Sequence, residues 1–206
     1  MKNIVKGILA GCLISIGCII YSACENKFLG VFLFSFGLFC IVSLGLNLYT
    51  GKIGYLVEKF NVKYGIELIN TLLGNFIGTV ITAEIFTYTR MAPKVLNFVQ
   101  TIVETKNTDN LISLFILSVF CGILMYLGVE IHRSSENPVS RVLAIVFAVS
   151  IFILAGFEHC VANMFYMVFA QNIDIGRLFI MIFGNSVGSL LFAGALKYLK
   201  GKEKNI

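Results

Sequence analysis

The chain has 206 residues, of which 58% are hydrophobic and 13% are charged, and its formal net charge is +5. Ordinary soluble domains carry about 25% charged residues, so this composition, with a mean hydropathy of +0.89, excludes a soluble globular protein. We predict an all-α integral membrane protein, surrounded by the lipid bilayer, that forms one domain over residues 1–206.

Runs of uncharged residues predict where the chain crosses the membrane, because a helix needs about 20 apolar residues to span the hydrocarbon. No cleavage site follows the first run, so it is predicted to be a span and not a signal peptide. The six predicted spans are residues 7–24, 28–51, 68–83 with an extension to 89, 110–129, 142–157 continuing past Glu158, and 178–196.

The lysines and arginines predict the orientation of these spans. Six spans place both termini on one side, and ten of the sixteen basic residues fall on that side, against five on the other and Lys52 near a predicted break. The bias predicts a multi-pass protein of the cell membrane with both termini in the cytoplasm. It also accounts for most of the net charge, so a nucleic-acid partner is not predicted.

Polar residues and glycines interrupt the second and fifth predicted spans, at residues 47–52 and 156–160. Backbone that leaves the helix at membrane depth has to line a cavity or be buried in protein, and paired breaks of this kind are typical of transport sites. Each break should also leave a half-helix N-terminus, whose free N–H groups favour an anion.

The third and sixth spans share a GNxxG pattern, "GNFIG" at 74–78 and "GNSVG" at 184–188. Asn75 follows Thr50 by 25 residues, and Asn185 follows His159 by 26. We predict an inverted 3+3 repeat with halves at about 1–90 and 107–200. The glycines should pack helices closely, and the two asparagines should bond carbonyls of the broken helices or line a pore.

His159 and Glu158 stand side by side in the fifth apolar run. Ionisable groups at membrane depth are costly and mark a pathway, which favours a functional His159. Glu158 should point to a different face and accept hydrogen bonds from N–H groups freed at the break. The six cysteines form no CxxC pair, so packing is predicted for them, with no metal site and no cofactor.

The run "GFEHCVANM" at 156–164, the loop "LNLYTGK" at 46–52 and the two GNxxG elements resemble the formate/nitrite transporter family, and the chain looks most similar to its hydrosulfide channel branch. The resemblance implies an aquaporin-like protomer of six helices with the second and fifth broken, a ring of five protomers, and a pore in each. The substrates implied are small inorganic or organic anions of weak acids, hydrosulfide first and then formate and nitrite.

The resemblance also implies site residues. The pore positions are the central His159, Thr50 facing it, the supporting Asn185 and a vestibule lysine, Lys106. The constriction positions are Phe34, Leu38, Leu48, Tyr49 and Phe152, and the structural positions at the breaks are Asn75, Glu158 and Asn163. The correspondence slips before the fourth span, so an ordinary solvated loop position stays open for Lys106.

Two other functions fit less well. A neutral-solute channel would share the architecture but would carry Asn-Pro-Ala at its breaks, whereas the two prolines, Pro93 and Pro138, lie elsewhere. An intramembrane enzyme could use His159, Glu158 and Cys160, but the sequence has neither HExxH nor GxSxG. We therefore predict transport and no enzyme activity, with His159 donating a hydrogen bond or a proton to the anion.

Overall fold

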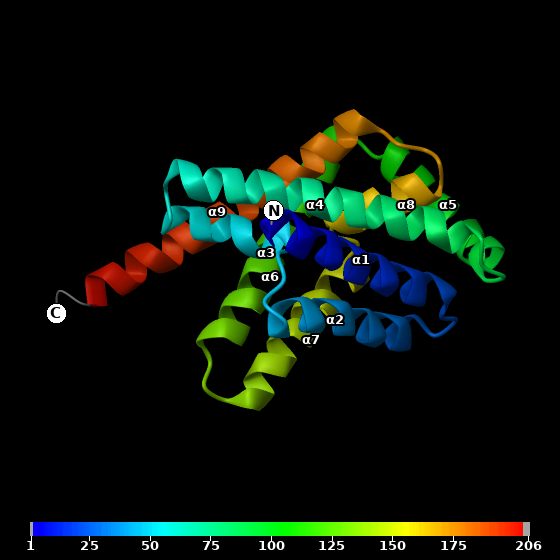
Figure 1. Ribbon diagram of the computed structural model, residues 1–206. Coiled ribbons are helices and arrows are strands. Elements are labelled where there is room, and N and C mark those ends of the chain that lie inside the picture. The colour runs from blue at the N-terminus through cyan, green and yellow to red at the C-terminus, as the bar shows by residue number, and fades with distance from the viewer. Residues whose placement is uncertain (1, 204–206) are drawn as a thin grey trace.

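The computed structural model describes residues 2–203, and this part of the chain is built from helices alone (Figure 1). The predicted all-α class is therefore confirmed. Lys204, one of the ten basic residues counted on the side of the termini, lies outside the described residues.

Four helices are long and apolar enough to cross a membrane, and they coincide with the first, third, fourth and sixth predicted spans. They are α1 (Lys2–Ala23), α4 (Val62–Thr87), α6 (Leu111–Ser134) and α9 (Ile175–Glu203). The remaining elements are α2 (Lys27–Ser43), α3 (Tyr49–Lys52), the 3₁₀ helix η1 (Ile53–Val57), α5 (Ala92–Thr108), α7 (Pro138–Leu154) and α8 (Cys160–Phe169).

Each of the other two apolar segments is divided by a five-residue loop. Between α2 and α3 the chain turns at Gly45, with φ +63°, and between α7 and α8 it turns at Gly156, with φ +69°. Only glycine adopts this left-handed conformation without strain. Helix resumes at Tyr49, so Thr50 and Lys52, which we predicted inside the break, are helical. The reason is that Leu48, in an extended conformation, begins a new helix one turn earlier than the polar residues suggested.

Two helix pairs, α1 with α4 and α6 with α9, approach each other closely through the glycines of the GNxxG pattern. A methyl group built on Gly78 would lie 2.1 Å from the carbonyl oxygen of Ile8, and one built on Gly188 would lie 2.0 Å from that of Val119. Backbone therefore packs directly on backbone at both crossings, as small residues allow in membrane proteins.

The short helices interlock these two pairs. Helix α8 packs on α4, and η1 packs on α9, so each short segment contacts a helix from the other half of the chain. Helices α2 and α7 contact each other and flank α1 and α6 as two hairpins (Figure 1). The centre of the protein is thus formed where the two interrupted segments meet.

The exterior of the protein is apolar and part of its interior is polar, which is the reverse of a soluble protein. Large apolar side chains such as Phe28, Phe32 and Phe36 lie on the exposed outside, whereas Thr50 and Asn185 are fully buried. An apolar exterior is what a bilayer requires, and a polar interior needs internal hydrogen-bond partners. With the four long helices, this distribution indicates a multi-pass membrane protein.

Helix α5 does not appear among the predicted elements. It is amphipathic and buries Val95, Val99 and Val103 on one face, while Lys94 and Gln100 on the other face are exposed. A search for uncharged runs passes over such a helix because its charged face interrupts every run. This helix matters for the site, because Lys106 lies in its last turn.

The close approach of α6 and α9 generates a prediction about stability. We expect Gly188→Ala to lower the free energy of unfolding by about 1–3 kcal/mol, because the new methyl group overlaps backbone that cannot rotate away. Gly194→Ala on the same helix is the matched control, since nothing lies within 4 Å of its added carbon. Thermal unfolding in detergent measures both variants, and equal melting temperatures would contradict backbone contact at Gly188.

Candidate functional site

A cavity of about 260 Å³ lies between the second interruption and helix α5. Its lining combines the polar side chains of Lys106, Glu158, His159 and Asn163 with aromatic rings, including Phe152. We call this space the His159 cavity. It lies at the end of the bundle away from the start of α1, because α5 follows the far end of α4.

His159 is held on both of its ring nitrogens. It caps the N-terminus of α8, where its Nδ1 accepts the backbone N–H of Ala162 at 3.1 Å, and its Nε2 lies 2.8 Å from Oγ1 of Thr50. Because Nδ1 accepts, the hydrogen of the neutral ring belongs on Nε2, where it can be donated. His159 and Thr50 are both buried, and they join the two interrupted segments.

Asn185 on α9 satisfies the backbone freed by the second interruption. Its Oδ1 accepts the N–H of Cys160 at 2.9 Å, and its Nδ2 donates to the carbonyl oxygens of Glu158 and Ser118, both at 2.7 Å. One side chain thus bonds the N–H of Cys160 and the carbonyl oxygen of Glu158, which the interruption leaves without helical partners, and joins them to α6 at Ser118.

Asn75 on α4 does the same at the first interruption. Its Oδ1 accepts the N–H of Tyr49 at 2.9 Å, and its Nδ2 donates to the carbonyl oxygens of Asn47 at 2.9 Å and Gly7 at 2.8 Å. Both asparagines are fully buried. They bond loop carbonyls, one of the two roles that the sequence left open for them.

These contacts shift the register of the predicted repeat. The sequence spacing matched Thr50 with His159, but the asparagines bond the N–H groups of Tyr49 and Cys160, which follow Leu48 and His159. Leu48 is also the N-cap residue of α3, and His159 is the N-cap residue of α8. The position equivalent to His159 in the first interruption is therefore the apolar Leu48.

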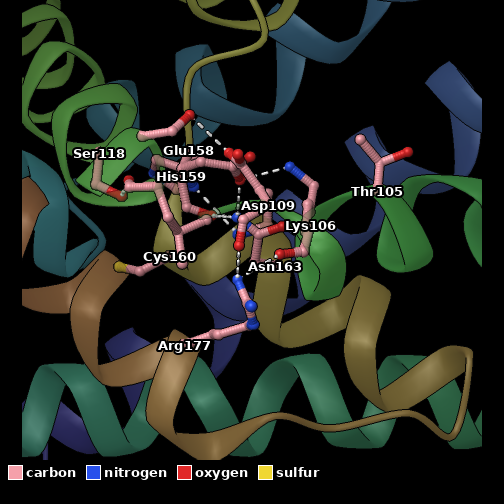
Figure 2. A network of polar contacts seen from close by, with 12 residues as sticks. Thr105, Lys106, Asp109, Ser118, Glu158, His159, Cys160, Asn163 and Arg177 are labelled. Atoms are coloured by element: carbon pink, nitrogen blue, oxygen red, sulfur yellow. Dashed lines mark hydrogen bonds and ion pairs between the residues drawn. The ribbon is translucent and has the colours of Figure 1, made fainter. Parts of the chain in front are cut away.

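Glu158 has partners other than those predicted. Its carboxylate accepts from the amine of Lys106, in an ion pair, and from Nδ2 of Asn163 at 2.8 Å (Figure 2). The freed N–H groups that we assigned to it are bonded by Asn185 and His159 instead. Glu158 lines the His159 cavity and does not point away from it.

Lys106 lies in the last turn of α5 and lines the His159 cavity, so it is not in a solvated loop. Its side chain is only 15% exposed. Arg177 at the start of α9 fixes this end of α5 by donating from Nη1 to the carbonyl oxygens of Lys106 at 3.0 Å and Asp109 at 2.7 Å (Figure 2). Sequence reasoning did not single out Arg177, because its role depends on a contact 71 residues away.

The predicted constriction residues divide between two cavities. Phe34 and Phe152 line the His159 cavity with ring centroids 6.0 Å apart, and the Phe152 ring lies 5.5 Å from that of His159. Leu38 and Leu48 line a second cavity of about 140 Å³.

Tyr49, the fifth predicted constriction residue, lines neither of these two cavities. Its hydroxyl lies 2.8 Å from Oγ of Ser186 on α9. A buried phenol requires a hydrogen-bond partner, and this contact joins Tyr49 to α9.

The polar groups that line the His159 cavity include the Nε2–H of His159, which is bonded to Thr50, and the amine of Lys106, which is paired with the carboxylate of Glu158. Oδ1 of Asn163 is buried and has no hydrogen-bond partner in the described part of the chain. Among residues 2–203, no group of three or more His, Cys, Asp or Glu is placed to hold a metal ion. The arrangement is suited to hydrogen bonding a small polar or anionic solute.

Comparison with known proteins shows one family. The family model described as formate/nitrite transporter matches residues 1–199. The formate channel FocA of Haemophilus influenzae is 25% identical over 183 residues, covering 79% of this chain. A formate-nitrite transporter of Plasmodium vivax is 25% identical over 199 residues, covering 84% of this chain. The chain spans 64% of the length of each of these two relatives.

A solved structure has the same fold. The structure described as a pentameric formate channel with formate bound superposes with a TM-score of 0.79, covering 96% of each chain, at 22% sequence identity. At this identity the likeness establishes the arrangement of the helices and nothing further about the site.

The hydrogen bonds of Asn185 generate a prediction. We expect Asn185→Ala to destabilise the protein by more than about 2 kcal/mol, because it leaves the N–H of Cys160 and the carbonyl oxygen of Glu158 buried without partners, at about 1–3 kcal/mol each. Asn97→Ala on the exposed face of α5 serves as the control. Thermal unfolding in detergent compares the two, and a melting temperature equal to that of the control would disprove this role of Asn185.

Proposed function

This chain belongs to the formate/nitrite transporter family, and from that premise we propose that it conducts small monovalent anions of weak acids across a membrane. The anion we place first is hydrosulfide, followed by formate and nitrite. In this proposal α2 with α3 and η1 forms a broken second span, and α7 with α8 forms a broken fifth span, which completes six. The protein acts as a channel or transporter and not as an enzyme.

The observation that carries the proposal is the position of His159. It lines a cavity whose wall includes the rings of Phe34 and Phe152, and the Lys106–Glu158 ion pair lies in the same wall. A bare anion faces a large desolvation barrier in such a place, and fixed hydrogen-bond donors lower that barrier. When an anion occupies the cavity, the Nε2–H of His159 exchanges its bond to Oγ1 of Thr50 for a bond to the anion.

The hydrogen bonds of His159 favour donation of a hydrogen bond over donation of a proton. A proton donor would be the imidazolium form, which carries hydrogen on both nitrogens. Nδ1, however, accepts the N–H of Ala162 at the start of α8, and adding a hydrogen there would remove that cap. We therefore propose that His159 solvates the anion as a neutral ring.

The two cavities are separated by apolar side chains, and we propose that these form the selectivity barrier. Phe34 and Phe152 close the His159 cavity on one side, and Leu38 and Leu48 close the second cavity on the other. A narrow apolar constriction filters solutes by size and by desolvation cost. Tyr49, which follows Leu48 and is bonded through its hydroxyl to Ser186, belongs to the proposed barrier as well.

We further propose a ring of five protomers with a separate pore in each, in the cell membrane, with both termini in the cytoplasm. The pentamer is suggested by the description of the solved formate channel. The orientation is suggested by the excess of lysine and arginine at the ends of the spans beside the termini.

Liposome flux of hydrosulfide, formate, nitrite and chloride over a pH series tests the function, and His159 variants test its mechanism. We expect His159→Phe to reduce flux of the weak-acid anions about ten-fold or more, because a hydrogen bond to a charged group contributes about 1.5–3 kcal/mol. His159→Asn keeps a donor that does not titrate, so we expect it to retain more flux than His159→Phe and to keep the pH dependence of the wild type, because the ring acts in its neutral form.

His132→Phe is the control, because this histidine lies outside the His159 cavity. A His159→Phe protein that conducts like the wild type from about pH 5 to 8 would show that His159 has no transport role.

The apolar barrier generates a second functional prediction. We expect Leu48→Ala and Phe152→Ala to raise the flux of larger carboxylates such as propionate relative to formate, because shortening these side chains widens the constriction. Leu191→Ala, on the exposed outside, is the matched control. The same flux assay gives the ratio of propionate flux to formate flux. An unchanged ratio in both variants would show that Leu48 and Phe152 only pack and do not select the anion.

A further inference from the structure

The second cavity has a charged lining, which has no role in the conduction mechanism proposed for His159 and the apolar barrier. It lies on the other side of Leu48 from His159, near the start of α1, and has a volume of about 140 Å³. Its apolar floor is formed by residues such as Leu38, and its lining includes the cations Lys52, Lys59 and Arg133 and no carboxylate. We call it the Lys52 cavity.

Lys52 lines this cavity, and its amine has two partners that lie outside the lining. It donates to Oδ1 of Asn47 at 3.0 Å and forms an ion pair of 2.5 Å with Oε1 of Glu67 on α4. The side chains of the pair are 27% and 26% exposed, so solvent reaches the bond and screens it only in part. A competing anion could therefore reach Lys52 without unfolding its surroundings.

The other charges leave the cavity positive. Lys59 lies 5.9 Å and 5.4 Å from the ring centroids of Tyr55 and Tyr64, and Arg133 lies 4.6 Å from that of Tyr55, so two cations face the cavity over aromatic rings. The nearby carboxylate of Glu130 accepts the hydroxyl of Tyr55 at 2.8 Å.

Glu130 is also paired with Lys200 at 3.7 Å, and Glu58, at the end of η1, is exposed. The neutral Lys52–Glu67 pair thus sits in a positive field, which favours an additional anion.

The arrangement matches the polar cluster of the His159 cavity. Asn47 comes directly before the N-cap residue of α3, Leu48, and Glu158 comes directly before the N-cap residue of α8, His159. Lys52 lies four residues after Leu48, and Asn163 lies four residues after His159. Each cluster contains one lysine, one carboxylate and one amide. Both sides of the apolar barrier therefore carry the same set of chemical groups.

We propose that the Lys52 cavity is a second binding site for the conducted anion, in which Lys52 exchanges its bond to Glu67 for a bond to the anion. This inference rests on the proposed function. The ligand class is a small monovalent anion, because the cavity is small and its lining contributes cations and hydroxyl groups. Glu67 competes with the anion for Lys52 and so sets the concentration at which the site fills on this side of the barrier.

The test measures unidirectional formate flux from each face of proteoliposomes, with the orientation of the protein determined by cleavage of a C-terminal tag. We expect Lys52→Gln to raise the half-saturating formate concentration at the face of the termini at least about three-fold, the size expected for a partly exposed ion pair. The value at the opposite face should stay unchanged. Glu67→Gln should shift the same value downward, because it frees Lys52.

The matched control is Lys63→Gln, which removes the same charge from an exposed position on α4 outside the cavity. Lys52→Arg keeps the charge and should stay near the wild type, and together with Glu67→Gln it decides the question if Lys52→Gln fails to fold. A conducting wild type with half-saturation unchanged in Lys52→Gln and Glu67→Gln would overturn the second site alone. A wild type that carries no anion would overturn the proposed function itself.

Discussion

The structure depends on one constraint, which is that backbone groups released inside an apolar environment have to find partners within the protein. Two helices stop near the centre of this chain, and the amide side chains of Asn75 and Asn185 bond both the N–H that opens each new helix and the carbonyl that precedes it. These bonds allow non-helical backbone at that depth. Without them neither the half-helix ends nor the cavities beside them would be stable.

Because the two interruptions have the same backbone bonding, their side chains are free to differ. At the N-cap of α3 the chain has Leu48, which contributes only an apolar wall, and at the N-cap of α8 it has His159, which bonds Thr50 across the centre. The polar centre thus belongs to neither interruption by itself. It consists of a donor from one segment and a hydroxyl from the other, placed next to each other by the interlocking of α8 with α4 and of η1 with α9.

The sequence predicted the features that depend on local composition. The four long helices follow from uncharged runs, and the close helix contacts follow from the spacing of Gly78 and Gly188. The features it missed depend on contacts between distant residues. The bond between Lys106 and Glu158 spans 52 residues, and Tyr49 reaches Ser186 across 137, so no local pattern reports either contact.

The glycine contacts have a consequence for the time scale of any gating. Where carbonyl oxygens meet α-carbons directly, as between α1 and α4 and between α6 and α9, there is no layer of flexible side chains over which the helices could slide. Rearrangement of these helices would have to break backbone contacts and would be a slow, collective event of microseconds or longer. Rotation of Leu38, Leu48, Phe34 or Phe152 requires no such movement. A barrier that opens by side-chain rotation alone would let anions diffuse through in either direction, following their gradient, with no cycle of inward-facing and outward-facing states.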